Sequence, residues 1–110
     1  MPDSGDIYTA YIFYKSTQGA YKLRPILVLN DDGNGSCTIV EITSIGPKNP
    51  PTHYDTFKEE IVGWRKCGLD QPSYVKCKNV HNVMGLRLKD KIGSMDPDEF
   101  EHIVNRIYES

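Results

Sequence analysis

The sequence predicts a mainly β fold of the α+β class, in which a small, strongly curved antiparallel sheet is closed by a C-terminal helix. Three runs rich in aromatic and β-branched residues follow one another within residues 7–45 and are joined by short polar links, which is typical of an antiparallel meander. The segment after Asp96 instead carries helix start signals and a helical spacing of apolar residues. A chain of 110 residues with 38% hydrophobic content can bury one modest core, so we expect a single domain over residues 1–110.

The first half of the chain predicts three strands, over residues 7–14, 25–29 and 37–45. The first two are separated by a polar loop at 15–20, whose length suits a hairpin. The strongest turn signal of the chain, at residues 30–35, separates the second strand from the third, because its Asp-Gly and Asn-Gly pairs can adopt positive φ. Consecutive strands joined in this way are expected to be antiparallel neighbours.

The second strand contains the most apolar run, Ile-Leu-Val-Leu at 26–29, which we expect to be buried on both faces. Pro25 is expected at the first position of this strand, where no ladder donor is missed. Arg24 then lies at the end of the most buried strand, with its guanidinium close to a rigid element. Such an arginine is suited to bind or polarise a phosphate. The alternative is that it caps the sheet by pairing with a carboxylate.

The expected register brings Arg24 close to a hydroxyl group. With the turn centred near residues 32–34, Arg24 lies opposite Thr43 to within about two residues. Thr43 and Ser44 end the third strand, directly before a proline-rich loop at 46–56. Loops of this length without regular structure tend to be functional or mobile. We therefore expect an arginine, two hydroxyl groups and a long loop at one end of the sheet.

The second half of the chain is less regular. Residues 57–64 are compatible with a short strand or with a turn of helix, and residues 80–88 mix apolar and polar side chains without a clear period. Short strands are expected at 73–77 and at 91–95.

The start of the C-terminal helix has the clearest local signals of the chain. Asp96 is expected as the N-cap and Pro97 at the first helical position, with Glu99 placed to complete a capping box. Met95 and Phe100 have the spacing of a hydrophobic staple across that cap.

The rest of this helix is amphipathic. His102 lies off the apolar stripe and is expected to be in solvent. The stripe that should face the sheet consists of Phe100, Ile103, Val104, Ile107 and Tyr108.

Cysteine and hydropathy patterns predict neither a metal site nor a membrane span. Cys37, Cys67 and Cys77 form no Cys-x-x-Cys pair, and the chain has only three histidines, so we expect reduced, partly buried thiols and no metal. No apolar run approaches the roughly 18 residues of a membrane span. The first residues are polar and acidic, unlike a signal peptide, which makes a cytoplasmic protein the expectation.

The net charge of −2 is unevenly distributed along the chain. Residues 65–91 contain seven Lys or Arg and only two Asp, whereas the segments before and after them are acidic. A basic segment within an acidic protein indicates an anionic partner that contacts one face.

Several short motifs, taken in order along the chain, resemble a known family. They are Gly5-Asp6-Ile7, Lys22-x-Arg24-Pro25, Ile42-Thr43-Ser44, Gly68-Leu69 with Pro72-Ser73, and Ile92-Gly93. With these motifs the chain resembles the MazF/PemK toxins, the ribosome-independent endoribonucleases of type II toxin–antitoxin systems. The resemblance implies an SH3-like barrel with a C-terminal helix, a homodimer, a cognate antitoxin protein as partner, single-stranded RNA as substrate and no cofactor.

The resemblance also implies roles for Arg24 and Thr43. In the family the ribose 2′-hydroxyl attacks the adjacent phosphorus without a metal, leaving a 2′,3′-cyclic phosphate and a 5′-hydroxyl. Arg24 would stabilise the charge that develops on the phosphate oxygens, but it is a poor general base because it stays protonated. Thr43 would hydrogen-bond the scissile phosphate. Lys22 and Ser44, close to these two residues in the sequence, are expected to bind the substrate.

The chain departs from the PemK pattern after the Pro-Ser motif. PemK-like members often carry Arg-Cys-Asp-Gln-Pro-Arg there, whereas residues 76–81 read Lys-Cys-Lys-Asn-Val-His. Lys78 occupies the place of the acid, and His81 is a candidate replacement base because imidazole exchanges protons near neutral pH. The alternative is a surface histidine without a role. Lys76 and Lys78 should face the same side of a strand, as phosphate contacts or as ordinary solvated lysines.

Recognition of RNA bases would use aromatic stacking and polar loop groups. The candidates are Lys15, Gln18 and Tyr21 in the first loop and His53 and Tyr54 in the long loop, although the aromatic residues could equally pack in the core. The alternative function is a non-catalytic interaction module, because the same barrel in CcdB-like toxins binds a topoisomerase. The pairing of an arginine with a threonine favours the nuclease.

Overall fold

The computed structural model describes residues 3–14, 20–47 and 57–109. Within these ranges the chain forms six strands and one α-helix, with a 3₁₀ turn at Gly85–Arg87. In chain order the elements are β1 (Asp6–Tyr14), β2 (Ala20–Asp31), β3 (Ser36–Thr43), β4 (Lys58–Glu60), β5 (Tyr74–Met84), β6 (Leu88–Ser94) and α1 (Pro97–Tyr108). None of the helical segments in the described ranges is long and apolar enough to cross a membrane.

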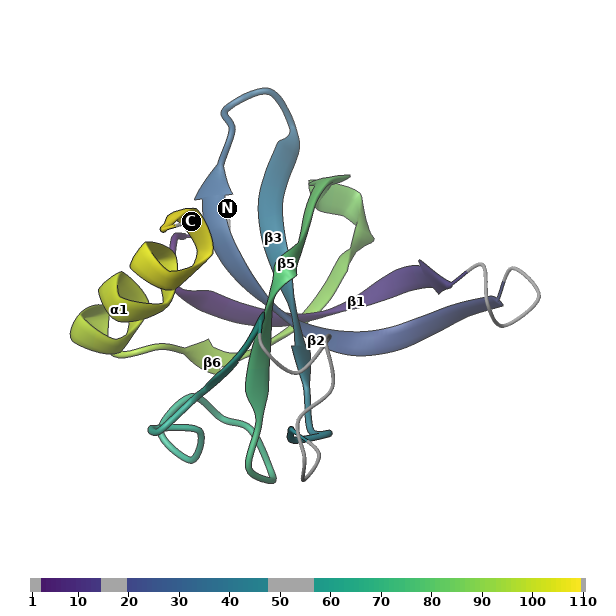
Figure 1. The fold of residues 1–110 in the computed structure, drawn as a ribbon. Helices are drawn as coiled ribbons and strands as arrows, with labels where there is room; N and C mark the ends of the chain where they lie inside the picture. Colours follow the sequence, from purple (N-terminus) through teal and green to yellow (C-terminus); the bar gives the residue numbers. More distant parts are fainter. Residues whose placement is uncertain (1–2, 15–19, 48–56, 110) are drawn as a thin grey trace.

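The strands form one antiparallel sheet in the order β4-β5-β3-β2-β1-β6. The sheet is strongly twisted, and α1 lies to one side of it (Figure 1). This arrangement confirms the predicted mainly β fold with a meander and a C-terminal helix. The sheet is open, because no ladder joins β4 to β6 among the described residues, and the barrel implied by the resemblance is therefore not closed by hydrogen bonds.

The register between β2 and β3 agrees with the prediction. The ladder pairs Ile26 with Glu41, Leu27 with Val40 and Val28 with Ile39. Continuing the same register by two residues places Arg24 opposite Thr43. The turn between the two strands also has the expected backbone, since both of its glycines, Gly33 and Gly35, have positive φ.

The expected position of Pro25 is wrong. Pro25 lies in the middle of β2, where it pairs with Thr9 of β1. The strand tolerates it because the ladder with β3 begins only at Ile26. The absent N–H therefore interrupts no pairing on that side of β2.

The sheet buries apolar side chains on both faces. The larger cluster lies under α1 and includes Leu27, Val40 and Ile103. The smaller cluster, on the opposite face, is built around Ile26 and Val28. Because β2 sends alternate side chains to opposite faces, its run at 26–29 contributes to both clusters and is buried throughout, as predicted.

The two uncertain segments of the second half are resolved by the sheet. Residues 58–60 form the edge strand β4, which pairs with residues 74–76 of β5, so the strand alternative for this segment is confirmed. The strand expected at 73–77 is longer than predicted, because β5 continues to Met84. Its second part lacks a clear apolar period since one side faces solvent and a shift in register interrupts its pairing with β3.

Two glycines bring the edge strand β6 against the segment that follows β4. A Cβ on Gly93 would collide with the backbone carbonyl of Cys67, and a Cβ on Gly68 would collide with that of Ile92. Gly68 also has a positive φ of 86°, which glycine adopts without strain. Close backbone contact at these two glycines therefore joins the two edges of the sheet without a hydrogen-bonded ladder.

The helix cap is partly as predicted. Asp96 accepts a hydrogen bond from the Asp98 N–H at 3.1 Å, and Pro97 is the first helical residue. The predicted capping box is wrong, because the Glu99 carboxylate accepts instead from the backbone N–H groups of Val62, at 2.7 Å, and Gly63, at 3.2 Å. Glu99 therefore ties the helix to the segment after β4 rather than to its own cap.

The helix stripe packs on the larger core cluster through Phe100, Ile103, Val104 and Ile107. Its last member was predicted wrongly, since Tyr108 is 63% exposed at the C-terminal end of the helix.

His102 is exposed, as expected, but its ring contacts a carboxylate. The carboxylate of Glu59 on β4 contacts His102 at 2.8 Å and Arg106 at 3.1 Å. Burial alone would raise the pKa of Glu59, but the hydrogen bonds from His102 and Arg106 outweigh it and lower that pKa. This contact anchors α1 to the edge of the sheet.

The three cysteines are buried free thiols, as predicted. Burial raises the pKa of Cys67 to about 11 and also raises the pKa values of Cys37 and Cys77. They are therefore thiols rather than thiolates at neutral pH.

Replacing Gly93 with Ala should destabilise the fold by about 1–3 kcal/mol, because the added methyl group overpacks a backbone contact. Urea denaturation measures the change. Gly85→Ala is the matched control, because its Cβ would meet the Gly35 carbonyl oxygen at 3.4 Å, close to ordinary contact distance. Equal stabilities of the two variants would contradict the tight contact at Gly93.

Glu99→Ala should cost about 1.5–3 kcal/mol, because two backbone N–H groups lose a charged acceptor. Asp96→Ala removes only the cap and should cost about 1 kcal/mol. Glu101→Ala, on the exposed side of the same helix, controls for helix propensity. The three free energies of unfolding test the assignment, and a Glu99 variant as stable as the Glu101 variant would refute it.

Candidate functional site

A pocket of about 160 Å³ opens where β2 and β3 run past each other toward the long loop. β2 contributes Lys22 and Arg24 to it, and β5 contributes Lys76. The remaining lining residues come from the end of β3 and the residues after it: Glu41, Ile42, Thr43, Ser44 and Ile45. The structure thus brings together five of the residues predicted from sequence, namely Lys22, Arg24, Thr43, Ser44 and Lys76.

Arg24 is exposed at the mouth of this pocket. No carboxylate in the part of the chain that the structure describes is within ion-pair distance of it. The alternative that Arg24 caps the sheet through a carboxylate therefore finds no partner among those residues. Its guanidinium is placed to meet an anion from solvent.

Thr43 is held by the turn that ends β3. Its hydroxyl oxygen accepts a hydrogen bond from the Ile45 N–H at 3.1 Å, which fixes the side chain relative to the backbone. A hydroxyl that accepts in this way still has a proton to donate. Thr43 can therefore donate to a phosphate oxygen that Arg24 also binds.

Glu41 lies in the pocket wall and was missed by the sequence analysis. It is only 3% exposed. Its Oε2 atom accepts from Asn79 Nδ2 at 3.1 Å and lies 2.7 Å from His81 Nε2, while Oε1 is 3.8 Å from Lys76 Nζ. The available signal was a charge within the apolar run Ile39-Val40-Glu41-Ile42, because a buried glutamate requires partners.

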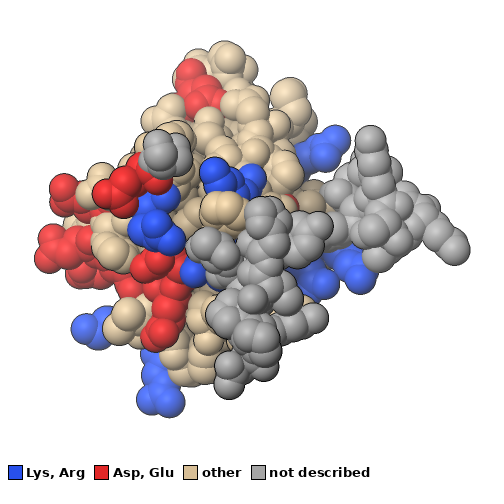
Figure 2. Space-filling view, in the orientation of Figure 1, with Lys and Arg blue, Asp and Glu red and all other residues tan. Residues whose placement is uncertain are grey.

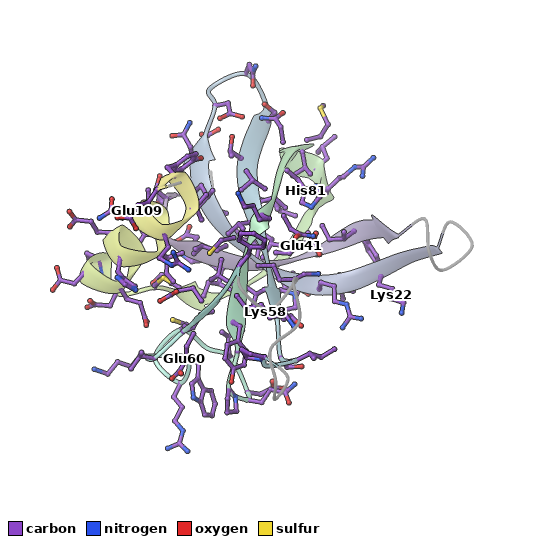
Figure 3. All side chains as sticks on the ribbon, viewed as in Figure 1. Lys22, Glu41, Lys58, Glu60, His81 and Glu109 are labelled. Carbon is purple, nitrogen blue, oxygen red and sulfur yellow. The ribbon has the colours of Figure 1, made fainter. Side chains whose placement is uncertain are left out.

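Figure 3 shows how the labelled side chains of this region lie. Glu41 is near the centre of the molecule and His81 is directly beside it, while Lys22 lies further along β2.

An irregularity in β5 brings the partners of Glu41 together. β3 pairs Val40 with Val80 but Ile42 with Val75. Residues 76–79 of β5 therefore all lie opposite the single residue Glu41. Such a bulge re-aims side chains, and here it directs Lys76 and Asn79 to the carboxylate that His81, paired with Ile39 in the regular ladder, also contacts.

A second pocket of about 360 Å³ adjoins the first, since Lys76 lines both. Its other lining residues are Phe57, Lys58, Lys78 and Asn79. Lys76 and Lys78 thus open onto the same pocket, as their spacing predicted. The Lys78 ammonium lies 4.8 Å from the centre of the Phe57 ring, which is a cation–π distance.

His81 does not line the pocket of Arg24 and Thr43. It is 40% exposed and lines a separate hollow with Tyr11, Asn82 and Arg87. The sequence predicted His81 as a catalytic candidate, and the structure links it to the first pocket only through Glu41.

The remaining predicted RNA-binding residues are not placed. Lys15, Gln18, His53 and Tyr54 lie outside the described residues, and the side chain of Tyr21 is not described. The long proline-rich loop predicted at 46–56 is described only at its first two residues.

The predicted basic segment does not form one surface. Lys76 and Lys78 line the pockets, but Arg65 stacks on Trp64 and Lys91 pairs with Asp6 at 3.4 Å. On the face seen in Figure 2, basic side chains occur in separate groups and acidic ones gather around α1. Within the described ranges, no three His, Cys, Asp or Glu side chains are grouped as a metal site requires.

The geometry concentrates positive charge around two joined pockets. Lys22, Arg24 and Lys76 line the first, and Lys58 and Lys78 line the second. Against these five cations the linings contribute one carboxylate, that of Glu41. Such a surface suits a polyanion with phosphates at successive positions.

Solved structures of similar fold are known. An endoribonuclease from a mycobacterial species aligns with a TM-score of 0.69 at 14% identity, over 96% of this chain and 86% of that one. The Mycobacterium tuberculosis toxin MazF-mt6 gives 0.66 at 21% identity over 93% and 91%. MazF from Deinococcus radiodurans gives 0.70 at 15% identity over 96% and 92%. These likenesses establish the fold.

No curated protein sequence matches the chain significantly. The model of the PemK-like, MazF-like toxins of type II toxin–antitoxin systems, however, matches residues 3–110. The match covers the sheet, the pocket residues and the helix, and it agrees with the motifs at Arg24 and Thr43. The chain therefore belongs to the PemK-like, MazF-like toxin family of type II toxin–antitoxin systems.

Proposed function

We propose that the protein is a toxin that cleaves single-stranded RNA, including mRNA, at selected sequences and without a metal. The observation that carries the proposal is the pocket that holds Arg24 and Thr43 together under the register of β2 and β3. The reaction is an attack of the ribose 2′-hydroxyl on the adjacent phosphorus, which gives a 2′,3′-cyclic phosphate and a 5′-hydroxyl.

Arg24 stabilises the reacting phosphate. Negative charge grows on the non-bridging oxygens as the 2′-oxygen attacks, and a guanidinium held in place stabilises that charge where it develops. Its planar set of donors can contact two oxygens at once. Thr43 donates its hydroxyl proton to the same phosphate and holds it against the arginine.

Neighbouring cations bind the rest of the strand. Lys22 and Ser44 flank the scissile phosphate in the first pocket. Lys76 is shared between the pockets, and Lys78 lies in the second. RNA phosphates are spaced along the backbone, so a row of cations across two pockets can contact successive ones.

The partners follow from the family. A cognate antitoxin protein blocks the RNA site, and the toxin itself is a homodimer. Solved structures of similar fold include an endoribonuclease in complex with its cognate antitoxin and MazE–MazF complexes. Action on mRNA places the protein in the cytoplasm.

The purified protein should cut a long RNA in the presence of EDTA, and the new 3′ ends should be cyclic phosphates. Primer extension maps the cleavage sites, and phosphatase treatment before and after acid opening of the cyclic ends identifies them. A control digest with the purified antitoxin should leave the RNA intact. RNA that stays intact without antitoxin would contradict the nuclease and favour the non-catalytic, CcdB-like alternative.

Arg24→Ala should slow cleavage by roughly 100- to 1000-fold, the usual loss for a preorganised donor to a developing oxyanion. Arg24→Lys should recover little, because an ammonium keeps the charge but lacks the planar set of donors. Thr43→Ala should be less damaging, since it removes a neutral hydrogen bond. Single-turnover rates on one mapped site measure the series. An Arg24→Ala protein that cuts at the wild-type rate, with contaminating nuclease excluded, would refute the mechanism.

A further inference from the structure

The residues to which the proposed reaction has so far given a role do not include a base. Arg24 stays protonated, Thr43 is a neutral donor, and the lysines of the two pockets are cations that bind phosphate. The attacking 2′-hydroxyl must nevertheless lose its proton as it bonds to phosphorus. A group that accepts this proton has to lie within a few ångströms of the scissile phosphate.

Glu41 is the carboxylate that lines the pocket of Arg24 and Thr43. It pairs with Ile26 in the ladder, so it occupies the position diagonal to Arg24 on the same face of the sheet. Diagonal neighbours are about 7–8 Å apart at the backbone, within the reach of long side chains. Glu41 is also two residues from Thr43 on one strand, and the two side chains therefore face the same side.

The partners of Glu41 fix the carboxylate in one orientation. Asn79 and His81 both contact Oε2, and Lys76 lies on the side of Oε1. Lys76 itself lines the pocket, so Oε1 is the oxygen on the side from which an RNA phosphate would enter. Among the charged groups that the structure describes, Lys76 and His81 of β5 contact Glu41, and Lys22 and Arg24 of β2 line the same pocket.

We propose that Glu41 is the general base of the RNA cleavage, an inference that rests on the proposed function. The Glu41 carboxylate takes the proton of the 2′-hydroxyl while the 2′-oxygen forms its bond to phosphorus. The bond between phosphorus and the 5′-oxygen then breaks, and its electron pair leaves with that oxygen, which takes a proton from water. The products are the cyclic phosphate and the 5′-hydroxyl.

His81 holds Glu41 in place. Its Nε2 atom contacts Glu41 Oε2 at 2.7 Å, and the ring is 40% exposed on the side away from the pocket. The proton that Glu41 takes returns to water at the pocket once the products have left. His81 acts through Glu41 in this scheme, which accounts for its absence from the pocket that binds the phosphate.

Glu41→Gln tests the proposal, because the amide keeps the shape of the side chain but cannot accept the proton. With enzyme in excess and one mapped site, we expect cleavage to fall roughly 100- to 10,000-fold, the range of general acid–base catalysis. Binding of an oligonucleotide with a 2′-deoxyribose at the cleaved position should change by less than tenfold. A Glu41→Gln protein that is folded and cuts within fivefold of wild type would overturn the proposal.

A modified substrate separates a base from an acid. Sulfur in place of the 5′-bridging oxygen makes a leaving group that needs no proton. This substrate should not restore cleavage by Glu41→Gln, because the attacking hydroxyl still needs its base. Restored cleavage would assign Glu41 to the leaving group and overturn the proposal.

The chain supplies a matched control in Glu59. Its carboxylate also contacts a histidine, His102, at 2.8 Å, but it lines neither pocket. Glu59→Gln should lower stability and leave cleavage per folded molecule unchanged. A loss of cleavage equal to that of Glu41→Gln would show that any Glu–His pair of the fold is required for structure, and would overturn the proposal.

Glu41→Asp decides the question if Glu41→Gln does not fold. The aspartate keeps the negative charge, but its shorter side chain places the carboxylate further from the 2′-hydroxyl. Cleavage should therefore fall at least tenfold without a loss of RNA binding. An Asp variant as fast as wild type would overturn the base. A wild-type protein that cuts no RNA would instead overturn the proposed function itself.

Discussion

The antiparallel ladder between β2 and β3 is the interaction on which the rest of the structure depends. Its register sends Ile26 and Val28 to one core cluster and Leu27 to the other. A slip of one residue would turn every side chain of the strand to the opposite face. The same register places Arg24 beside Thr43, so the packing of the core and the geometry of the pocket are fixed by one set of hydrogen bonds.

The burial of Glu41 within this sheet is unfavourable for folding. A buried carboxylate loses its hydration and is tolerated only when other groups replace it. The bulge of β5 and the ladder beside it supply these groups, since the bulge sets four residues against one and directs Asn79 to the oxygen that His81 also contacts. Bulges occur frequently beside active sites. A carboxylate held in this way at the wall of a cationic pocket is better explained by a role in catalysis than by a role in packing.

The face of the sheet that carries α1 has a separate role. There the edges meet through the contact of Gly93 with Cys67, and the helix is fastened by Glu99 and by the Glu59 cluster. None of these residues lines the two joined pockets. Stability of the edges and binding of a polyanion therefore depend on different side chains, which allows their contributions to be measured independently.

The sequence by itself determined the features that are local or set by a short turn. The three N-terminal strands, the register that places Arg24 opposite Thr43, and the cap at Asp96 all follow from residue patterns over a few positions. It also carried the motifs of the family. These features were predictable because turn geometry and side-chain periodicity act over short distances along the chain.

Only the tertiary structure decided what depends on residues far apart in the chain. Glu99 has the spacing of a capping box, but its carboxylate instead accepts hydrogen bonds from the backbone N–H groups of Val62 and Gly63. Pro25 fits within a strand because the ladder between β2 and β3 begins one residue later, at Ile26. In the sequence, Glu41 looks like an ordinary residue of a strand. Its hydrogen-bond donors come from β5, some 40 positions away. The physical reason is the same in each case, because a polar group takes its partner from whatever the fold brings within hydrogen-bond distance.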